Sequence, residues 1–139
     1  MANYTEINGL LNERLAEIPD LPIWGRENQN ISPEDDDLYL QSNLVPADSQ
    51  NPFLGSIAPT YESGTFVVLV CLVKGRSWGF AYEWVDKIVE KFKRGTVLTT
   101  SAEDITVRIK KSFPVSGFYG DNGRYIIPIH IEYFSYVEI

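Results

Sequence analysis

The chain has 139 residues, of which 44% are hydrophobic and 13% aromatic, and its formal net charge is −7. A chain of this length is expected to form one domain that buries roughly two-thirds of its unfolded surface, so its core needs no metal or disulfide. The excess of acidic over basic residues argues against a protein that binds duplex DNA by neutralising its phosphates. The single cysteine, Cys71, excludes an intrachain disulfide and a thiolate metal cluster.

The N-terminal residues favour a cytoplasmic protein. They read MANYTEINGLL and lack both the basic start and the continuous apolar stretch of a secretory signal peptide. No segment approaches the ~18 consecutive apolar residues of a membrane-spanning helix. We therefore expect no membrane partner.

Residues 4–18 predict an amphipathic helix. Asn3 can cap its first turn, Glu6 stands three residues later where it can reach back, and Pro19 helps to end it. The apolar side chains recur at helical spacing and form one stripe, made of Ile7, Leu10, Leu11, Leu15 and Ile18.

Residues 19–37 predict a flexible loop or arm. This segment contains three prolines and a run of four acidic residues, Glu34, Asp35, Asp36 and Asp37. A tight carboxylate cluster can bind calcium, but this one lacks the alternating ligands and central glycine of an EF-hand loop. We interpret it as a solvated charge run, and the sequence leaves its role open.

Two strands and a long connection follow. Residues 38–45 predict a half-buried strand, because leucines alternate with polar residues. Residues 46–64 are rich in Pro, Gly, Ser and Asp, and loops of this length are usually functional or disordered. Its apolar residues either pack onto the domain or dock into a neighbouring subunit: Phe53, Leu54 and Ile57. Residues 65–73 are apolar on both faces and predict a central strand covered on both sides.

Residues 77–94 predict a second helix. Ser77 is a suitable N-cap, and Gly95 stands where a C-terminal cap belongs. One face of this helix carries its apolar side chains, which are Trp78, Ala81, Trp84, Val85, Ile88, Val89 and Phe92.

The last third of the chain is rich in predicted strands. Residues 105–110 alternate between apolar residues and polar ones, so that Arg108 and Lys110 share one face. A strand continues or resumes over 112–120, and Asp-Asn-Gly at 121–123 is a hairpin signal. Residues 124–137 predict a long strand, in which Pro128 indicates a bulge or an edge position.

These elements predict the order α-β-β-α-β-β-β. We expect a single α+β domain over 1–139, in which two main helices pack on a largely antiparallel sheet. The arm at 19–37 and the long loop at 46–64 are its irregular segments.

No pattern of residues specifies a catalytic site. The glycine turn at Gly75 follows a strand and precedes a helix, but its spacing does not match a phosphate-binding loop or a dinucleotide fingerprint. His130 is the only histidine and points away from the isoleucines beside it, which favours a structural role. Glu132 and Glu138 share its face, an arrangement equally typical of a solvated sheet. We expect no enzyme activity and no cofactor.

Three stretches of the chain form a recognisable set. The first, 64–70, reads GTFVVLV and follows the long loop. The second, 74–78, reads KGRSW and leads into the helix over 81–92. The third, 120–125, reads GDNGRY and precedes IPIHI at 127–131. Together with the opening helix they span most of the chain, and in this order they resemble the small tail-terminator proteins of long-tailed phages, which are also called minor tail or tail-completion proteins.

This resemblance implies a structural protein of the virion tail, present in the host cytoplasm during assembly. It implies a homo-oligomeric ring, usually of six copies, that caps the tail tube, stops its polymerisation and presents a surface for head–tail joining. Its partners would be further copies of itself, the tail tube protein and the head–tail connector protein. DNA would pass through the lumen without specific binding.

Contact residues follow from loop length and residue type. Loop 46–64, through Phe53, Leu54 and Ile57, could clasp a neighbouring subunit or the tube end. Arg108 and Lys110 could meet acidic residues of the next copy. Two alternatives stay open: another tail or connector component, such as a tube subunit or neck protein, and more remotely a small enzyme with an unrecognised carboxylate site.

Overall fold

The computed structural model describes residues 4–25, 38–47, 60–73, 75–100, 105–120 and 123–137. The proposed cap Asn3, the acidic run at 34–37 and the loop residues Phe53, Leu54 and Ile57 lie outside these ranges. The elements in chain order are α1 (Tyr4–Ala16), β1 (Ile23–Gly25), β2 (Leu38–Pro46), β3 (Thr60–Leu72), α2 (Trp78–Lys91), β4 (Val97–Thr99), β5 (Thr106–Pro114), β6 (Phe118–Tyr119) and β7 (Tyr125–Val137).

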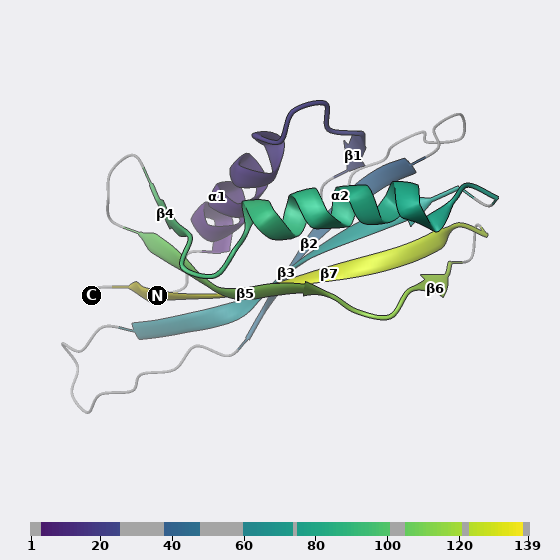
Figure 1. The fold of residues 1–139 in the computed structure, drawn as a ribbon. Coiled ribbons are helices and arrows are strands. Elements are labelled where there is room, and N and C mark those ends of the chain that lie inside the picture. The colour runs from purple at the N-terminus through teal and green to yellow at the C-terminus, as the bar shows by residue number, and fades with distance from the viewer. Residues whose placement is uncertain are drawn as a thin grey trace.

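The strands form one curled sheet in the order β1-β2-β3-β7-β5-β4, and β6 pairs with the start of β7 (Figure 1). Strands β3 and β7 pair along their whole length, from Thr60 opposite Val137 to Leu72 opposite Tyr125. Every pair is antiparallel except β1 with β2, which is parallel. The predicted α+β class is therefore confirmed.

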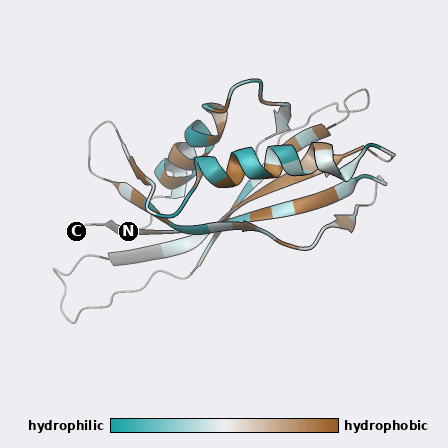
Figure 2. Cartoon of the chain, viewed as in Figure 1, coloured by the Kyte–Doolittle hydropathy of each residue, from teal (hydrophilic) through white to brown (hydrophobic). Residues whose placement is uncertain are grey.

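Helices α1 and α2 pack on the same face of the sheet (Figure 1). Alternate residues of the central strands point towards them and are fully buried, such as Val68 opposite Ile129. The helices contribute apolar stripes, visible as bands on α2 in Figure 2, that include Leu11 and Ile88. The core therefore consists of strand residues that recur at every second position and helix residues that recur about every 3.6 positions.

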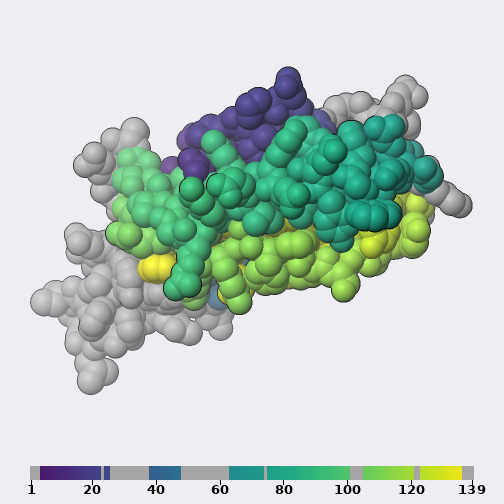
Figure 3. Space-filling view, in the orientation of Figure 1, coloured from purple at the N-terminus to yellow at the C-terminus, as the bar shows by residue number. Residues whose placement is uncertain are grey.

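The two helices are also joined at their ends. Arg14 of α1 donates its Nε–H to the carbonyl oxygen of Lys91 over 3.0 Å, which satisfies a carbonyl in the last turn of α2. The carboxylate of Glu17 forms ion pairs on both sides of this contact, 3.7 Å from Nη1 of Arg14 and 3.1 Å from Nζ of Lys91. Figure 3 shows α1 and α2 side by side on this face, with β5 continuing the surface beside α2.

A buried chain of polar side chains ties α1 to the sheet. Trp24 of β1 donates its Nε1–H to the hydroxyl of Ser42 over 3.1 Å. Ser42 donates in turn to Oδ1 of Asn12 over 2.8 Å, and the amide group of Asn12 donates to Asn8. Both Asn12 and Ser42 are buried, so each polar group has the partner that its burial requires.

Two short strands were not predicted. Strand β1 lies within the predicted arm, and β4 follows α2; each has only three residues, too few to show a period in the sequence. Strand β3 also begins at Thr60, so the predicted long loop was wrong at its C-terminal end. The prediction that β3 is a central strand is confirmed. The predicted cover on both faces is not found among the described residues, because both helices lie on one face, and Val67 and Leu69 are half-buried on the other.

The interpretation of Pro128 as a bulge or a position in an edge strand was wrong, since β7 is a central strand and its register with β3 is unbroken at this residue. On the other side, pairing with β5 ends at Ile129 and pairing with β6 begins at Ile126, so Pro128 lies in the gap between those two strands. The carbonyl of Pro128 accepts from the amide of Val115, just beyond the end of β5. The proline nitrogen points to that same side, so its missing hydrogen removes nothing from the ladder with β3.

Helix α2 begins as predicted and ends slightly differently. Ser77 is the N-cap, and its hydroxyl accepts from the amide of Gly79. Phe92 is the C-cap, and Gly95 takes a positive φ of 89° three residues later. Trp78 was placed on the buried face, which was wrong: it is 70% exposed, because it is the first residue of α2 and precedes Ala81, the first residue of the helix to be buried.

Candidate functional site

A groove rich in basic residues lies where β4, β5 and β7 meet the turn after α2. We call it the basic groove; its volume is about 710 Å³. Its lining residues are Arg94, Gly95, Val97, Arg108, Ile109, Lys110, Lys111, Glu132 and Phe134. The structure therefore brings together Arg108 and Lys110, the two described residues that the sequence proposed for a subunit contact.

A β-bulge at Lys110 builds this groove. Ile109 pairs with Tyr133 and Lys111 pairs with Glu132, so Lys110 is an extra residue in β5. After the bulge the alternation of faces is reset. Lys111 therefore stands beside Glu132, while Ser112 turns to the helices and donates to the carbonyl of Val89 over 3.1 Å. Without the extra residue, Lys111 would take a core-facing position.

The groove carries an excess of positive charge. Four cationic side chains line it against one carboxylate, Glu132, whose Oε2 lies 3.6 Å from Nζ of Lys111. Nζ of Lys110 lies 5.9 Å from the ring centroid of Phe134, within range of a cation–π interaction. Arg94 and Arg108 are exposed, and neither forms an ion pair within the described part of the chain. The groove is thus basic, whereas the chain as a whole carries −7.

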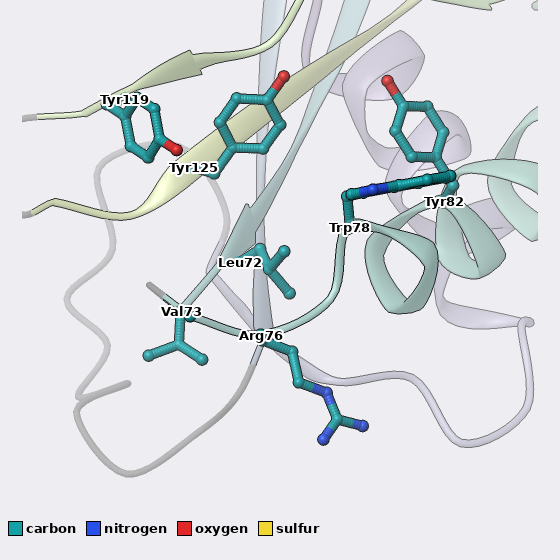
Figure 4. Close-up of a pocket in the computed structure, with 8 residues that line it drawn as sticks. Leu72, Val73, Arg76, Trp78, Tyr82, Tyr119 and Tyr125 are labelled. Carbon is teal, nitrogen blue, oxygen red and sulfur yellow. The ribbon is translucent and has the colours of Figure 1, made fainter.

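A pocket lined by aromatic rings lies at the opposite end of the sheet. We call it the aromatic pocket; its volume is about 350 Å³, and Leu72, Val73, Gly75, Arg76, Trp78, Tyr82, Tyr119 and Tyr125 line it. Figure 4 shows Trp78 and Tyr82 on one side of the pocket and Tyr119 and Tyr125 on the other. The first pair meets edge to face at 5.9 Å between centroids, and the second lies at 5.3 Å.

The aromatic pocket was not predicted from the sequence. Trp78 and Tyr119 are 70% and 71% exposed, which is unusual for such large rings. The available signal was the position of Trp78 directly after the N-cap Ser77, ahead of the first buried residue of α2. Exposed Trp and Tyr beside Arg76 have the composition of residues that dominate binding energy in protein interfaces.

The distance between the basic groove and the aromatic pocket follows from the register of the sheet. Leu72 borders the aromatic pocket, whereas Arg108 of the groove pairs with Phe134, which pairs with Ser63. Nine residue steps of β3 separate Ser63 from Leu72, a distance of about 30 Å along the strand. The molecule therefore presents two unlike surfaces at its two ends.

Glu138 lies outside the described residues, and the polar candidates that are described do not come together as a catalytic group. His130 is half-buried on the helix-free face, and its ring lies 5.7 Å from that of Phe113. Burial raises the pKa of the Cys71 thiol, although a hydrogen bond with Tyr39 and the charge of Arg124 act the other way. A thiol of raised pKa is a weak nucleophile at neutral pH. Among the described residues, no group of three His, Cys, Asp or Glu side chains could hold a metal.

None of the described helices has the length and apolar character needed to cross a membrane. One solved structure is similar to this chain with a TM-score of 0.73 and 20% identity, over 100% of this chain and 98% of the other. At that identity the likeness shows the fold alone. No curated protein matches. The family model described as phage tail terminator protein matches residues 6–133. The chain therefore belongs to the phage tail terminator family, a family of structural proteins of the virion tail.

Proposed function

We propose that this protein caps the phage tail tube as a closed ring, usually of six copies, and stops the polymerisation of the tube. The same ring forms the surface to which the head–tail connector binds. The observation that carries this proposal is the match of the tail terminator family model over 6–133, nearly the whole chain.

The unlike ends of the molecule support a ring. In a cyclic ring each copy uses one surface to contact a different surface of the next, so one chain must present two unlike patches. The basic groove and the aromatic pocket are such a pair, and about 30 Å of sheet separates them. In this proposal Arg108 and Lys110 contact the neighbouring copy.

The connection between β2 and β3 supplies a further contact in the proposal. Phe53, Leu54 and Ile57 would bury apolar side chains against a neighbouring subunit or the end of the tube. Burial of such side chains in an interface contributes through the hydrophobic effect.

The proposed mechanism is steric and electrostatic, with no chemical step. A ring seated on the last layer of tube subunits covers the surface to which the next layer would bind. DNA passes through its lumen without specific binding, and the net charge of −7 per copy would oppose retention of the phosphate backbone.

The test is an assembly reaction of tail tube protein with and without this chain. We expect added chain to shorten the tubes and fix their length, as seen by electron microscopy. A chain that instead adds to the tubes as a building block would be a tube subunit. A chain that leaves tube length unchanged and does not bind tube ends would contradict the proposal.

A further inference from the structure

We propose that the basic groove is the docking site for the acidic run of a neighbouring copy, Glu34, Asp35, Asp36 and Asp37. This inference rests on the proposed ring and names the partner of one of its contacts. It assigns a role to the one charge run of the sequence that the fold does not explain.

Charge complementarity is the first support. The groove holds four cations against one carboxylate, and that carboxylate already contacts Lys111 at 3.6 Å. Arg94 and Arg108 stand exposed, and among the described residues no carboxylate pairs with them. The acidic run offers four carboxylates in succession. Arg guanidinium groups form the strongest such contacts, since they can bind a carboxylate through two parallel hydrogen bonds.

The apolar residues that line the groove favour a peptide over nucleic acid. Val97 is 47% exposed, and Phe134, which also lines the groove, is half-buried. The residue that follows the acidic run is Leu38, and Ile31 and Pro33 precede the run. A mixed acidic and apolar segment can contact both the cations and the apolar residues, whereas a phosphate backbone needs cations alone.

Chain connectivity requires that the occupant come from another copy. The acidic run ends at Asp37, which is bonded to Leu38, the first residue of β2, and Leu38 pairs with Leu72 beside the aromatic pocket. Four residues reach at most ~14 Å from Leu38.

The cations of the groove lie farther away than that. Lys111, the nearest by register, pairs with Glu132, which pairs with Thr65, seven residue steps or about 23 Å from Leu72 along the strand. Arg108 lies about 30 Å away by the same measure. The run as a whole therefore cannot lie in the groove of its own copy.

The resulting contact is directional. The acidic run is bonded to Leu38, which lies at the aromatic end of one copy, and the basic groove lies at the other end of the next. A contact between unlike ends repeats from copy to copy, and it closes into a ring when the rotation between copies allows. The two charge groups are thus placed where a head-to-tail ring requires them.

The first arm of the test uses a fluorescent peptide of residues 31–38, ISPEDDDL. It is titrated into the full chain carrying E34Q, D35N, D36N and D37N, whose groove no longer has an acidic occupant from another copy. We expect saturable binding that weakens as salt is raised. The added pair R108E and K110E should lower the affinity at least about tenfold. The control K87E, an exposed cation of α2 outside the groove, should leave it unchanged.

The second arm exchanges the charges between copies. One variant carries lysine at all four positions of the acidic run, and the other carries R108E and K110E. Each alone should lose the oligomer seen for the unaltered chain, by light scattering or on tube ends, because like charges then meet. An equimolar mixture should regain it, since each variant then finds a complementary partner.

The outcomes separate this inference from the proposed function. Absence of peptide binding, or a mixture that fails to regain assembly, overturns the inference even if the unaltered chain forms rings and stops tubes. A short DNA duplex that binds the groove in place of the peptide also overturns it. If the unaltered chain fails to stop tube growth, the proposed function is contradicted instead, and the peptide titration still decides the docking site.

Discussion

Single side chains in this protein couple elements that are distant in sequence. Ser42 is the clearest case, because its hydroxyl accepts from Trp24 in β1 and donates to Asn12 in α1. One buried hydroxyl therefore joins three elements of the fold. The alternation over 38–45 places Ser42 on the same face as the leucines, but the sequence could not show its hydrogen-bond partners, because they lie 18 and 30 residues away.

Removing this hydroxyl tests the polar chain. We expect Ser42→Ala to lower the free energy of unfolding by about 1–3 kcal/mol, since it removes the hydrogen bonds of the Ser42 hydroxyl with buried Asn12 and half-buried Trp24. Denaturant unfolding followed by tryptophan fluorescence measures the effect. The control Ser116→Ala removes an exposed hydroxyl and should change the value by less than about 0.5 kcal/mol. Equal effects of the two substitutions would contradict a role for the buried chain.

We expect the replacement of glycine by alanine to have opposite effects at two positions. A Cβ at Gly64 would lie 2.7 Å from the carbonyl oxygen of Val45 and 2.9 Å from Cα of Pro46, so the paired strands must separate. We expect Gly64→Ala to destabilise the fold by about 1–3 kcal/mol. A Cβ at Gly9 in α1 meets nothing within 4 Å, so Gly9→Ala should stabilise by up to about 1 kcal/mol. Thermal unfolding of both variants checks the signs.

At the scale of elements, what the sequence could predict depended on length and periodicity. Strand β7 and helix α2 each carry a long apolar pattern, and both were placed within a few residues. Strands β1 and β4 have three residues each, and they form by pairing with β2 and β5 respectively. Local sequence cannot report such pairing, since it depends on a neighbour that tertiary structure brings near.

The candidate surfaces show the same limit. The alternation in β5 placed Arg108 and Lys110 on one outward face, as the structure confirms. The bulge that adds Lys111 to them has no signal in the sequence, because register is a property of the strand pair. The aromatic pocket combines α2, β6 and β7, and only the folded chain brings these together.

Deleting Lys110 tests the bulge. Removal of the extra residue should shift the pairing register. Lys111 would then lose its ion pair with Glu132, and Ser112 would lose its hydrogen bond to the carbonyl of Val89. We expect a loss of more than about 2 kcal/mol in the free energy of unfolding, because a charged side chain would turn towards the core. The control Lys110→Ala keeps the bulge and removes only the charge. A deletion no more harmful than this control would contradict the bulge as a determinant of the groove.

At the scale of the molecule, charge is distributed unevenly. Five of the twelve Lys and Arg residues fall within 93–111, although the chain carries 19 acidic residues. Such a separation gives the protein a directional field that suits association between unlike ends. The proposed ring uses this separation, with the apolar loop residues adding buried area.

The loop contact is tested by replacing Phe53 and Leu54 with serine. We expect the double variant to assemble more weakly, because it loses apolar surface at the proposed contact, while its unfolding midpoint stays within the range of surface substitutions. Sedimentation velocity measures the assembly, and S49A with Q50A in the same loop is the matched control. Unimpaired rings from the double variant would remove this loop from the interface.

The central claim is that the chain ends tube growth by capping it as a ring, and one measurement tests this most directly. Purified tail tube protein is polymerised with increasing amounts of the chain, and tube lengths and tube ends are imaged by electron microscopy. We predict that tubes stop growing once their ends are occupied, each by one ring of this protein. Tubes that continue to lengthen with the chain bound, or that incorporate it along their length, would contradict the claim.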